Sequence, residues 1–161
     1  MDWRRMARLV VTVHTADVPD DGEWAEYVAG ANAYLPLEDQ RVLVVSAGGG
    51  PNGKQRKMIV DVLNGAIVPV AIITNSWLMR GSGIAVSWFN PSLKVLGPGT
   101  LDTAIEYLGL TTWERVESAR ILKELQQGLG LDVARLLALR RWPGFRHTAA
   151  PGPEGKGARS P

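Results

Sequence analysis

The stretch that decides the fold is residues 41–55, RVLVVSAGGGPNGKQ. Its first six residues are apolar almost throughout, as expected for a strand of an α/β sheet that is covered on both faces. Glycines 48–50 and Pro51 then turn the chain, and residues 54–63 carry apolar side chains at helical spacing. A buried strand, a glycine-rich turn and a helix form one βα unit.

The same order recurs on both sides of this stretch. Three further segments are apolar and rich in β-branched residues, which predicts strands at residues 9–15, 68–74 and 92–96. Three other segments have helical periodicity, at residues 22–29, 77–89 and 100–108. Four successive βα units imply an α/β fold with a mostly parallel sheet and right-handed crossovers.

The C-terminal third breaks this alternation. Two helical pieces are predicted at residues 113–125 and 131–139, followed by a proline- and glycine-rich tail that is too polar to pack. The first piece has an apolar stripe of Val116, Ala119, Leu122 and Leu125. We therefore divide the chain into an α/β domain at 1–110, a helical extension at 111–141 and a disordered tail at 142–161.

The two C-terminal helices have different expected roles. We expect the first to dock on the sheet and the second to contribute to a partner or self-association surface, because an apolar stripe must be buried somewhere. Three large apolar side chains in this region are candidate interface anchors: Trp113, Leu136 and Trp142.

The pattern also resembles a known family. The strand at 68–74, a helix opened by Trp77, the run Trp88-Phe89-Asn90-Pro91, a short strand and a helix beginning Thr100-Leu101-Asp102 are similar to the SpoIIAA-like fold of the STAS (sulfate transporter and anti-sigma-factor antagonist) superfamily. The likeness covers roughly residues 6–110. It implies a small non-enzymatic module that binds a partner protein and, in some branches, a lipid or nucleotide.

The resemblance does not extend to the phosphorylated serine of the anti-sigma antagonists. That serine stands at the start of the helix in an Asp-Ser-Ser-Gly-like sequence, where this chain has Gly50-Pro51-Asn52-Gly53-Lys54. Ser46 is the nearest hydroxyl and lies at the predicted end of the strand, so it is a weak phosphorylation candidate.

The glycine-rich turn raises the question of a nucleotide site. It matches G-x-x-x-x-G-K, but Gln55 stands where the magnesium-binding Ser or Thr belongs, and Pro51 removes a backbone donor. We therefore do not favour even a degenerate P-loop. The helix N-terminus and neighbouring basic residues leave an anionic ligand as an alternative, with these candidate binding residues: Gly48, Gly49, Gly50, Asn52, Gly53 and Lys54.

Composition narrows the function further. The chain has no cysteine and two histidines, His14 and His147, which excludes disulfides and multi-histidine metal sites, and we expect neither metal nor cofactor. No apolar run approaches the ~20 residues that cross a bilayer, and no signal region is evident, so we expect a cytoplasmic protein. The net charge is +2, and the sequence has no dense cluster of basic residues, so it does not favour nucleic-acid binding.

Together these observations predict a non-catalytic, STAS-like protein-interaction module that is regulatory in bacterial signalling. Its partner is an unidentified protein, and a homo-oligomer remains open. The alternative is a small-molecule binder that holds an anionic ligand, nucleotide or lipid at the glycine-rich loop, residues 48–54.

Overall fold

The computed structural model describes residues 1–33, 36–76 and 90–131 of the 161-residue chain. Its centre is a five-stranded sheet in which spatial order follows chain order. The strands are β1 (Asp2–Met6), β2 (Leu9–His14), β3 (Arg41–Ser46), β4 (Val70–Thr74) and β5 (Leu93–Leu96). β1 pairs antiparallel with β2, and the other neighbours are parallel. The predicted α/β fold with a mostly parallel sheet is confirmed.

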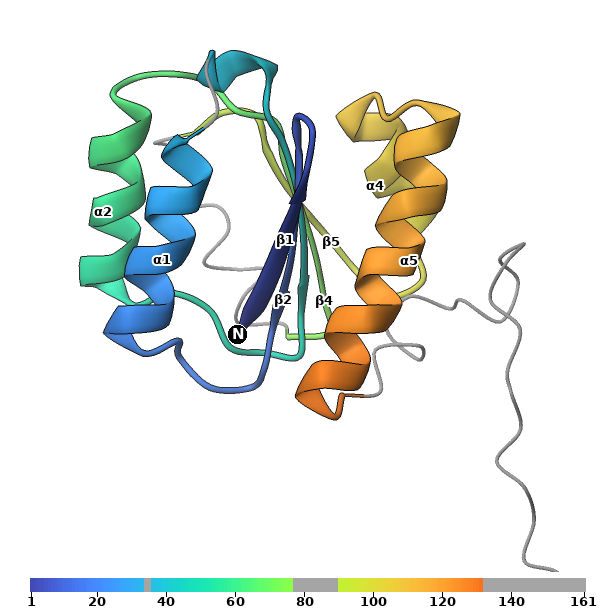
Figure 1. Ribbon diagram of the computed structural model, residues 1–161, viewed down its shortest axis with the longest axis horizontal. Helices are drawn as coiled ribbons and strands as arrows, with labels where there is room; N and C mark the ends of the chain where they lie inside the picture. The colour runs from blue at the N-terminus through green and yellow to red at the C-terminus, as the bar shows by residue number, and fades with distance from the viewer. Residues whose placement is uncertain (34–35, 77–89, 132–161) are drawn as a thin grey trace, which may run out of the picture.

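Helices cover both faces of this sheet (Figure 1). α1 (Asp21–Asn32) and α2 (Gly53–Leu63) lie on one face, and α4 (Leu101–Leu108) and α5 (Thr112–Leu129) lie on the other. A short 3-10 helix, η1 (Leu37–Asp39), precedes β3. The described residues therefore contain the βα pairs β2–α1, β3–α2 and β5–α4. The helix predicted at 77–89 lies outside the described residues, as do residues 132–139 of the second C-terminal helix and the tail.

The first strand was not predicted. β1 carries Asp2, Arg4 and Arg5, and this charge hides the alternating pattern by which a half-buried strand is recognised. Because β1 lies at the edge of the sheet, charged side chains there also discourage pairing with another chain. The sheet is consequently mixed, with one antiparallel edge strand.

Two apolar clusters hold the layers together. Alternate residues of β2 point to opposite faces, so Leu9, Val11 and Val13 pack under α4 and α5, whereas Val10 packs under α1 and α2. On the α5 side the cluster includes Ile121, Leu122 and Leu125. On the α1 side it includes Trp24, Tyr27 and Val28.

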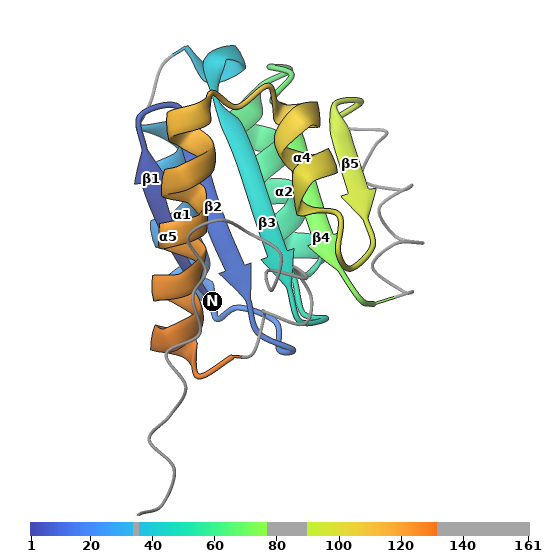
Figure 2. The same ribbon diagram turned by 90° about the vertical axis from the view of Figure 1, so that its right-hand side faces the viewer.

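α5 docks on the sheet, as the sequence predicted for the first C-terminal helix, and lies along β1 and β2 (Figure 2). Its buried face differs from the predicted stripe, however. Val116 is 60% exposed, whereas Leu122 and Leu125 are 0% and 1% exposed. The remaining inward side chains are Glu114, Ser118 and Ile121.

A charged contact supports this orientation of α5. Arg8, in the turn between β1 and β2, donates from Nε to Oε1 of Glu114 at 2.8 Å and from Nη2 to Oε2 at 3.1 Å. The same carboxylate accepts the N–H of Thr111 at 2.7 Å and completes a capping box. The Arg8 guanidinium lowers the pKa of Glu114 to about 2. Glu114 therefore joins Ile121, Leu122 and Leu125 on the inward face, and Val116 lies on the outward one.

In the part of the chain that the structure describes, no helix combines the length and the apolar character that a membrane span requires.

Candidate functional site

Three polar side chains meet where the central strands end. His14 of β2, Ser46 of β3 and Thr74 of β4 are aligned in register across neighbouring parallel strands. They are 4%, 0% and 0% exposed, respectively. In open α/β sheets this carboxyl edge is where ligands bind when a crevice is present, so the free hydrogen-bonding capacity of each group there decides whether it could hold a ligand.

The glycine-rich loop is folded against the loop that follows β2. Ala47 N–H donates to His14 O and Gly49 N–H donates to Thr15 O, both at 3.0 Å. Ser46 Oγ donates to Gly49 O at 2.6 Å and accepts Gly48 N–H at 3.0 Å. Three consecutive backbone donors of the loop are therefore used within the protein.

The glycines at 48 and 49 have conformational reasons to be there. Gly48 has φ of 129°, a region that favours glycine. A Cβ on Gly49 would lie 2.1 Å from the carbonyl oxygen of Asp17, a distance that the backbone could not accommodate. Loop packing thus accounts for these two glycines without a phosphate. The same loop buries Ser46 completely, so phosphorylation of its hydroxyl would require the loop to open.

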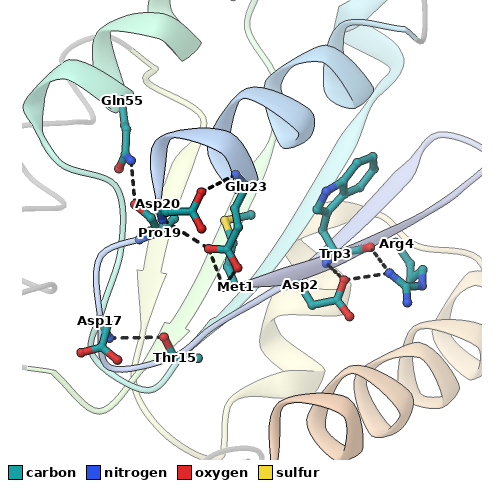
Figure 3. Close-up of polar contacts among 10 residues, drawn as sticks. All are labelled: Met1, Asp2, Trp3, Arg4, Thr15, Asp17, Pro19, Asp20, Glu23 and Gln55. Atoms are coloured by element: carbon teal, nitrogen blue, oxygen red, sulfur yellow. Dashed lines mark hydrogen bonds and ion pairs between the residues drawn. The ribbon is translucent and has the colours of Figure 1, made fainter.

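Gln55 has a structural role in place of the Ser or Thr of a P-loop. Its Oε1 accepts Asn52 N–H, and Asn52 Oδ1 accepts Gln55 N–H, both at 3.0 Å, which forms a capping box at the start of α2. Gln55 is fully buried, and its Nε2 donates to Pro19 O at 2.8 Å (Figure 3). This side chain ties the start of α2 to the loop before α1.

Lys54 points to a carboxylate on the neighbouring helix. Its Nζ donates to Oδ2 of Asp21 at 2.8 Å, with the two side chains 73% and 63% exposed. The hydrogen bond from Lys54 holds the pKa of Asp21 below its usual value. The charge of Lys54 is therefore offset locally. Of the other two loop candidates, Gly50 lies in the same turn, and Gly53 is the first residue of α2, directly after Asn52.

The acidic residues before α1 also have local partners. Asp20 and Glu23 form a capping box, with Glu23 N–H donating to Asp20 Oδ1 at 2.8 Å. The amino group of Met1 contacts both carboxylate oxygens of Glu23 at 3.1 Å (Figure 3). Asp17 N–H donates to the hydroxyl of Thr15 at 3.3 Å. These contacts shape the loop and do not form a pair of carboxylates suited to acid–base chemistry.

Among the described residues at this edge, His14 has a buried nitrogen without a hydrogen-bond partner. Its ring lies 6.3 Å from that of Trp24, and its Nδ1 has no hydrogen-bond partner among the described residues. Burial lowers the pKa of His14 to about 4, so the imidazole is neutral at pH 7. Because Ser46 donates its proton to Gly49 O, the two side chains do not form a nucleophile–base pair. No cluster suited to a metal ion occurs in the residues described.

The outer face of α5, unlike the carboxyl edge of the sheet, exposes large apolar side chains. Trp113 and Val116 are 58% and 60% exposed and lie one turn apart. Trp113 is one of the three interface anchors predicted from the sequence, and the structure places it in solvent. The other two, Leu136 and Trp142, lie outside the described residues.

Comparison of the chain with protein-family models, curated proteins and solved structures gives no match. Evidence on function therefore comes from the geometry of the carboxyl edge of the sheet and of the outer face of α5.

Sequence reasoning missed the structural roles of two buried polar residues, Gln55 and Glu114. Both have a readable signal, since each is the third residue after a capping Asn or Thr: Asn52-x-x-Gln55 and Thr111-x-x-Glu114. Asp20-x-x-Glu23 is a third example. The structure assigns all three pairs to helix starts.

Proposed function

We propose that this chain is a non-catalytic, STAS-like interaction module that acts in bacterial signalling and binds a partner protein through the outer face of α5. The observation that carries the proposal is the exposure of Trp113 and Val116, at 58% and 60%, on a helix whose opposite face is sealed against the sheet. Tryptophan is enriched among the residues that dominate protein interfaces.

The surroundings of these two side chains suit an interface. Arg120 lies one to two turns further along the same face and pairs with Glu117 at 2.8 Å and with Glu124. An apolar centre with a charged border is the usual anatomy of a protein-binding surface. We call this surface the α5 face: Trp113, Val116, Glu117, Arg120 and Glu124.

The α5 face is also held rigidly. Leu122 and Leu125 anchor α5 in the core, and Glu114 is bound by Arg8 from the β1–β2 turn. A surface that is already ordered loses little conformational entropy when a partner binds. Rigidity therefore favours this helix over a loop as the binding element.

The sheet topology disfavours the small-molecule alternative at residues 48–54. Ligands of open α/β sheets bind where the strand order reverses and neighbouring connections diverge to opposite faces. Here β2, β3 and β4 follow one another in chain order, with α1 and α2 on the same face (Figure 1). This part of the carboxyl edge therefore lacks the diverging connections that open a crevice.

The test is a pair of matched double variants. Trp113→Ala with Val116→Ala removes the apolar centre of the α5 face, and Val18→Ala with Ile67→Ala removes two apolar side chains that are 55% and 51% exposed elsewhere. Proteins captured from native lysate by the unmodified chain are identified and their affinities measured for each variant. We expect the α5 variant to weaken binding by about 30-fold, the loss of one interface hot spot, and the control to bind normally.

Equal binding by both variants would refute the proposal. So would a rise in melting temperature of the unmodified chain with nucleotides or phosphorylated lipids, if Lys54→Ala abolished it, because a ligand that binds the native state stabilises it. That result would support the small-molecule alternative.

A further inference from the structure

Two Asn–Gly pairs lie at the ends of α2, Asn52–Gly53 at its start and Asn64–Gly65 directly after it. An asparagine side chain can react with the backbone nitrogen of a following glycine, because glycine has no side chain to hinder the approach. Both asparagines are exposed. We propose that Asn64 is a site of spontaneous deamidation, whereas the folded structure protects Asn52. This inference does not depend on the proposed function.

The reaction consumes water and releases ammonia. The backbone nitrogen of Gly65 attacks Cγ of Asn64 and loses its proton to solvent. The bond from Cγ to Nδ2 breaks, and the amide nitrogen takes up a proton and leaves as ammonia, so that a succinimide ring remains. Water then opens the ring at either carbonyl. Cleavage at Cγ gives aspartate, and cleavage at the backbone carbonyl gives isoaspartate, in which the chain runs through Cγ.

The backbone at Asn64 and Gly65 forms a tight turn. Asn64 has φ of 44° and ψ of 41°, and Gly65 has φ of 86°, values close to those of a type I′ turn. Ala66 N–H donates to Leu63 O at 2.7 Å, which is the hydrogen bond that closes such a turn. In this conformation the nitrogen of Gly65 points away from the side chain of Asn64. The turn must therefore change before the two atoms can react.

A flip of the peptide plane between Asn64 and Gly65 makes this change. The flip rotates ψ of Asn64 and φ of Gly65 by roughly half a turn each and converts type I′ into type II′, with the closing hydrogen bond in place. It brings the nitrogen of Gly65 to the side of the Asn64 side chain. Within the described part of the chain, neither the N–H nor the C=O of this peptide unit has a hydrogen-bond partner. The flip therefore breaks no hydrogen bond among these residues.

The Asn52–Gly53 pair is held by the start of α2. Asn52 O accepts the N–H of Arg56 at 2.9 Å, so a rotation of this peptide plane would disturb a hydrogen bond of the helix. Asn52 Oδ1 accepts Gln55 N–H at 3.0 Å, which holds the side chain that would have to react. Because ψ of Asn52 is 179°, a smaller rotation is needed here than at Asn64. That rotation must, however, displace a carbonyl and a side chain that both bond to α2.

Deamidation of Asn64 would change the end of α2. Both products carry a carboxylate in place of a neutral amide, and Asp61 already lies in the last turn of the helix. The C-terminal end of a helix carries a negative partial charge, so a further carboxylate there is unfavourable. Isoaspartate also adds a backbone carbon, which a type I′ turn does not accommodate.

The test follows both asparagines in one sample of the full-length chain, kept folded in mildly alkaline buffer. Trypsin cuts after lysine and arginine and therefore places them on separate peptides, 42–54 and 58–80. Mass spectrometry detects the conversion of amide to carboxyl, and fragmentation distinguishes Asn64 from Asn75 on the second peptide. Chromatography separates isoaspartate from aspartate. The same chain unfolded in guanidinium chloride is the matched control.

We expect Asn64 to deamidate at least about 10-fold faster than Asn52 in the folded chain, because opening a capped helix start costs more than flipping an unbonded peptide. Isoaspartate and aspartate should both form at Asn64. In the unfolded chain the two rates should become similar, since both asparagines precede glycine and neither is held by a cap or a turn.

Three results would overturn the proposal. The first is an equal rate at the two sites in the folded chain, or a faster one at Asn52. The second is a difference that persists in the unfolded chain, because the neighbouring sequence and not the fold would then set it. The third is aspartate without isoaspartate at Asn64, because water would then have hydrolysed the amide directly, without attack by Gly65.

Discussion

The core cluster under α1 and α2 contains the aromatic side chains of Trp24 and Tyr27 among its aliphatic ones, whereas the buried members of the cluster under α4 and α5 are all aliphatic. In the first layer Trp24 donates its indole N–H to Gln55 O at 2.8 Å, and His14, Ser46 and Gln55 are all buried nearby. In the second cluster Leu122 and Leu125 contact the sheet, and the exposed side chains of Trp113 and Val116 lie on the outer side of α5.

This contrast separates residues that resemble a site from residues that are free to bind. The α1–α2 layer holds nearly every motif that suggested chemistry, yet the hydrogen-bonding groups of Ser46, Asn52 and Gln55 are used to join loops and helix starts. The α4–α5 layer contains no suggestive motif but presents Trp113 to solvent. A polar residue in a glycine-rich turn is thus weaker evidence for binding than an apolar residue left outside a well-packed helix.

The largest expected effect lies within α5 and compares its two sides. Leu122→Ala removes a side chain that is 0% exposed and should lower the free energy of unfolding by about 2–5 kcal/mol. Val116→Ala, on the exposed side, should change it by less than about 0.5 kcal/mol. Urea denaturation measures both. Similar losses for the two variants would mean that α5 is rotated from the orientation described.

A smaller effect tests the polar links of the α1–α2 layer. Gln55→Ala removes a capping partner and leaves the buried Pro19 carbonyl without its donor, so we expect a loss of about 2–3 kcal/mol in unfolding free energy. Lys54→Ala at the preceding position should leave stability unchanged, because its ion pair with Asp21 is exposed. Thermal denaturation measures the stability of the two variants. If Gln55→Ala is as stable as the unmodified chain, Gln55 does not have the structural role described.

The third effect concerns pH and belongs to the same layer. His14 has a folded-state pKa of about 4 against 6.5 when unfolded, because burial disfavours its charged form. Between these values the unfolded chain binds more protons, so stability falls as pH decreases through this window. From pH 7 to pH 5 we expect a loss of about 2 kcal/mol. The amino group of Met1 adds to the lowering, and Glu23 faces that amino group.

His14→Gln is the control for this titration. The variant retains the acidic groups of the protein but lacks the imidazole, so its unfolding free energy should change much less over the same pH range. A slope equal to that of the unmodified chain would assign the pH dependence to other groups.

Sequence patterns predicted the central elements well. β3 has the bounds expected for it, because a strand covered on both faces is apolar along its whole length and needs no partner to be recognised. β1 was missed because an edge strand can carry charge. Trp113, which the sequence predicted as an interface anchor, is exposed. A large aromatic side chain in a predominantly polar helical turn can be recognised in the sequence itself.

The stripe predicted for α5 was wrong at Val116. The helix buries Ser118, Ile121, Leu122 and Leu125, which have ordinary helical spacing, so the sequence pattern gives this face once Ile121 is counted. The contact of Glu114 with Arg8, 106 residues away, is not visible in the periodicity of one helix. The roles of Gln55 and Ser46 were hidden for the same reason, since both act through loops that meet only in the folded protein.

The placement of α5 against β2 also has a consequence for the order of events on the ribosome. β2 ends at residue 14, and the helix that covers one of its faces ends at residue 129. At synthesis rates of about 5–20 residues per second, roughly 6–20 seconds separate the two. During that interval Leu9, Val11 and Val13 lack the helix that later covers them. The newborn chain thus displays an aliphatic strand face of the kind that chaperones engage.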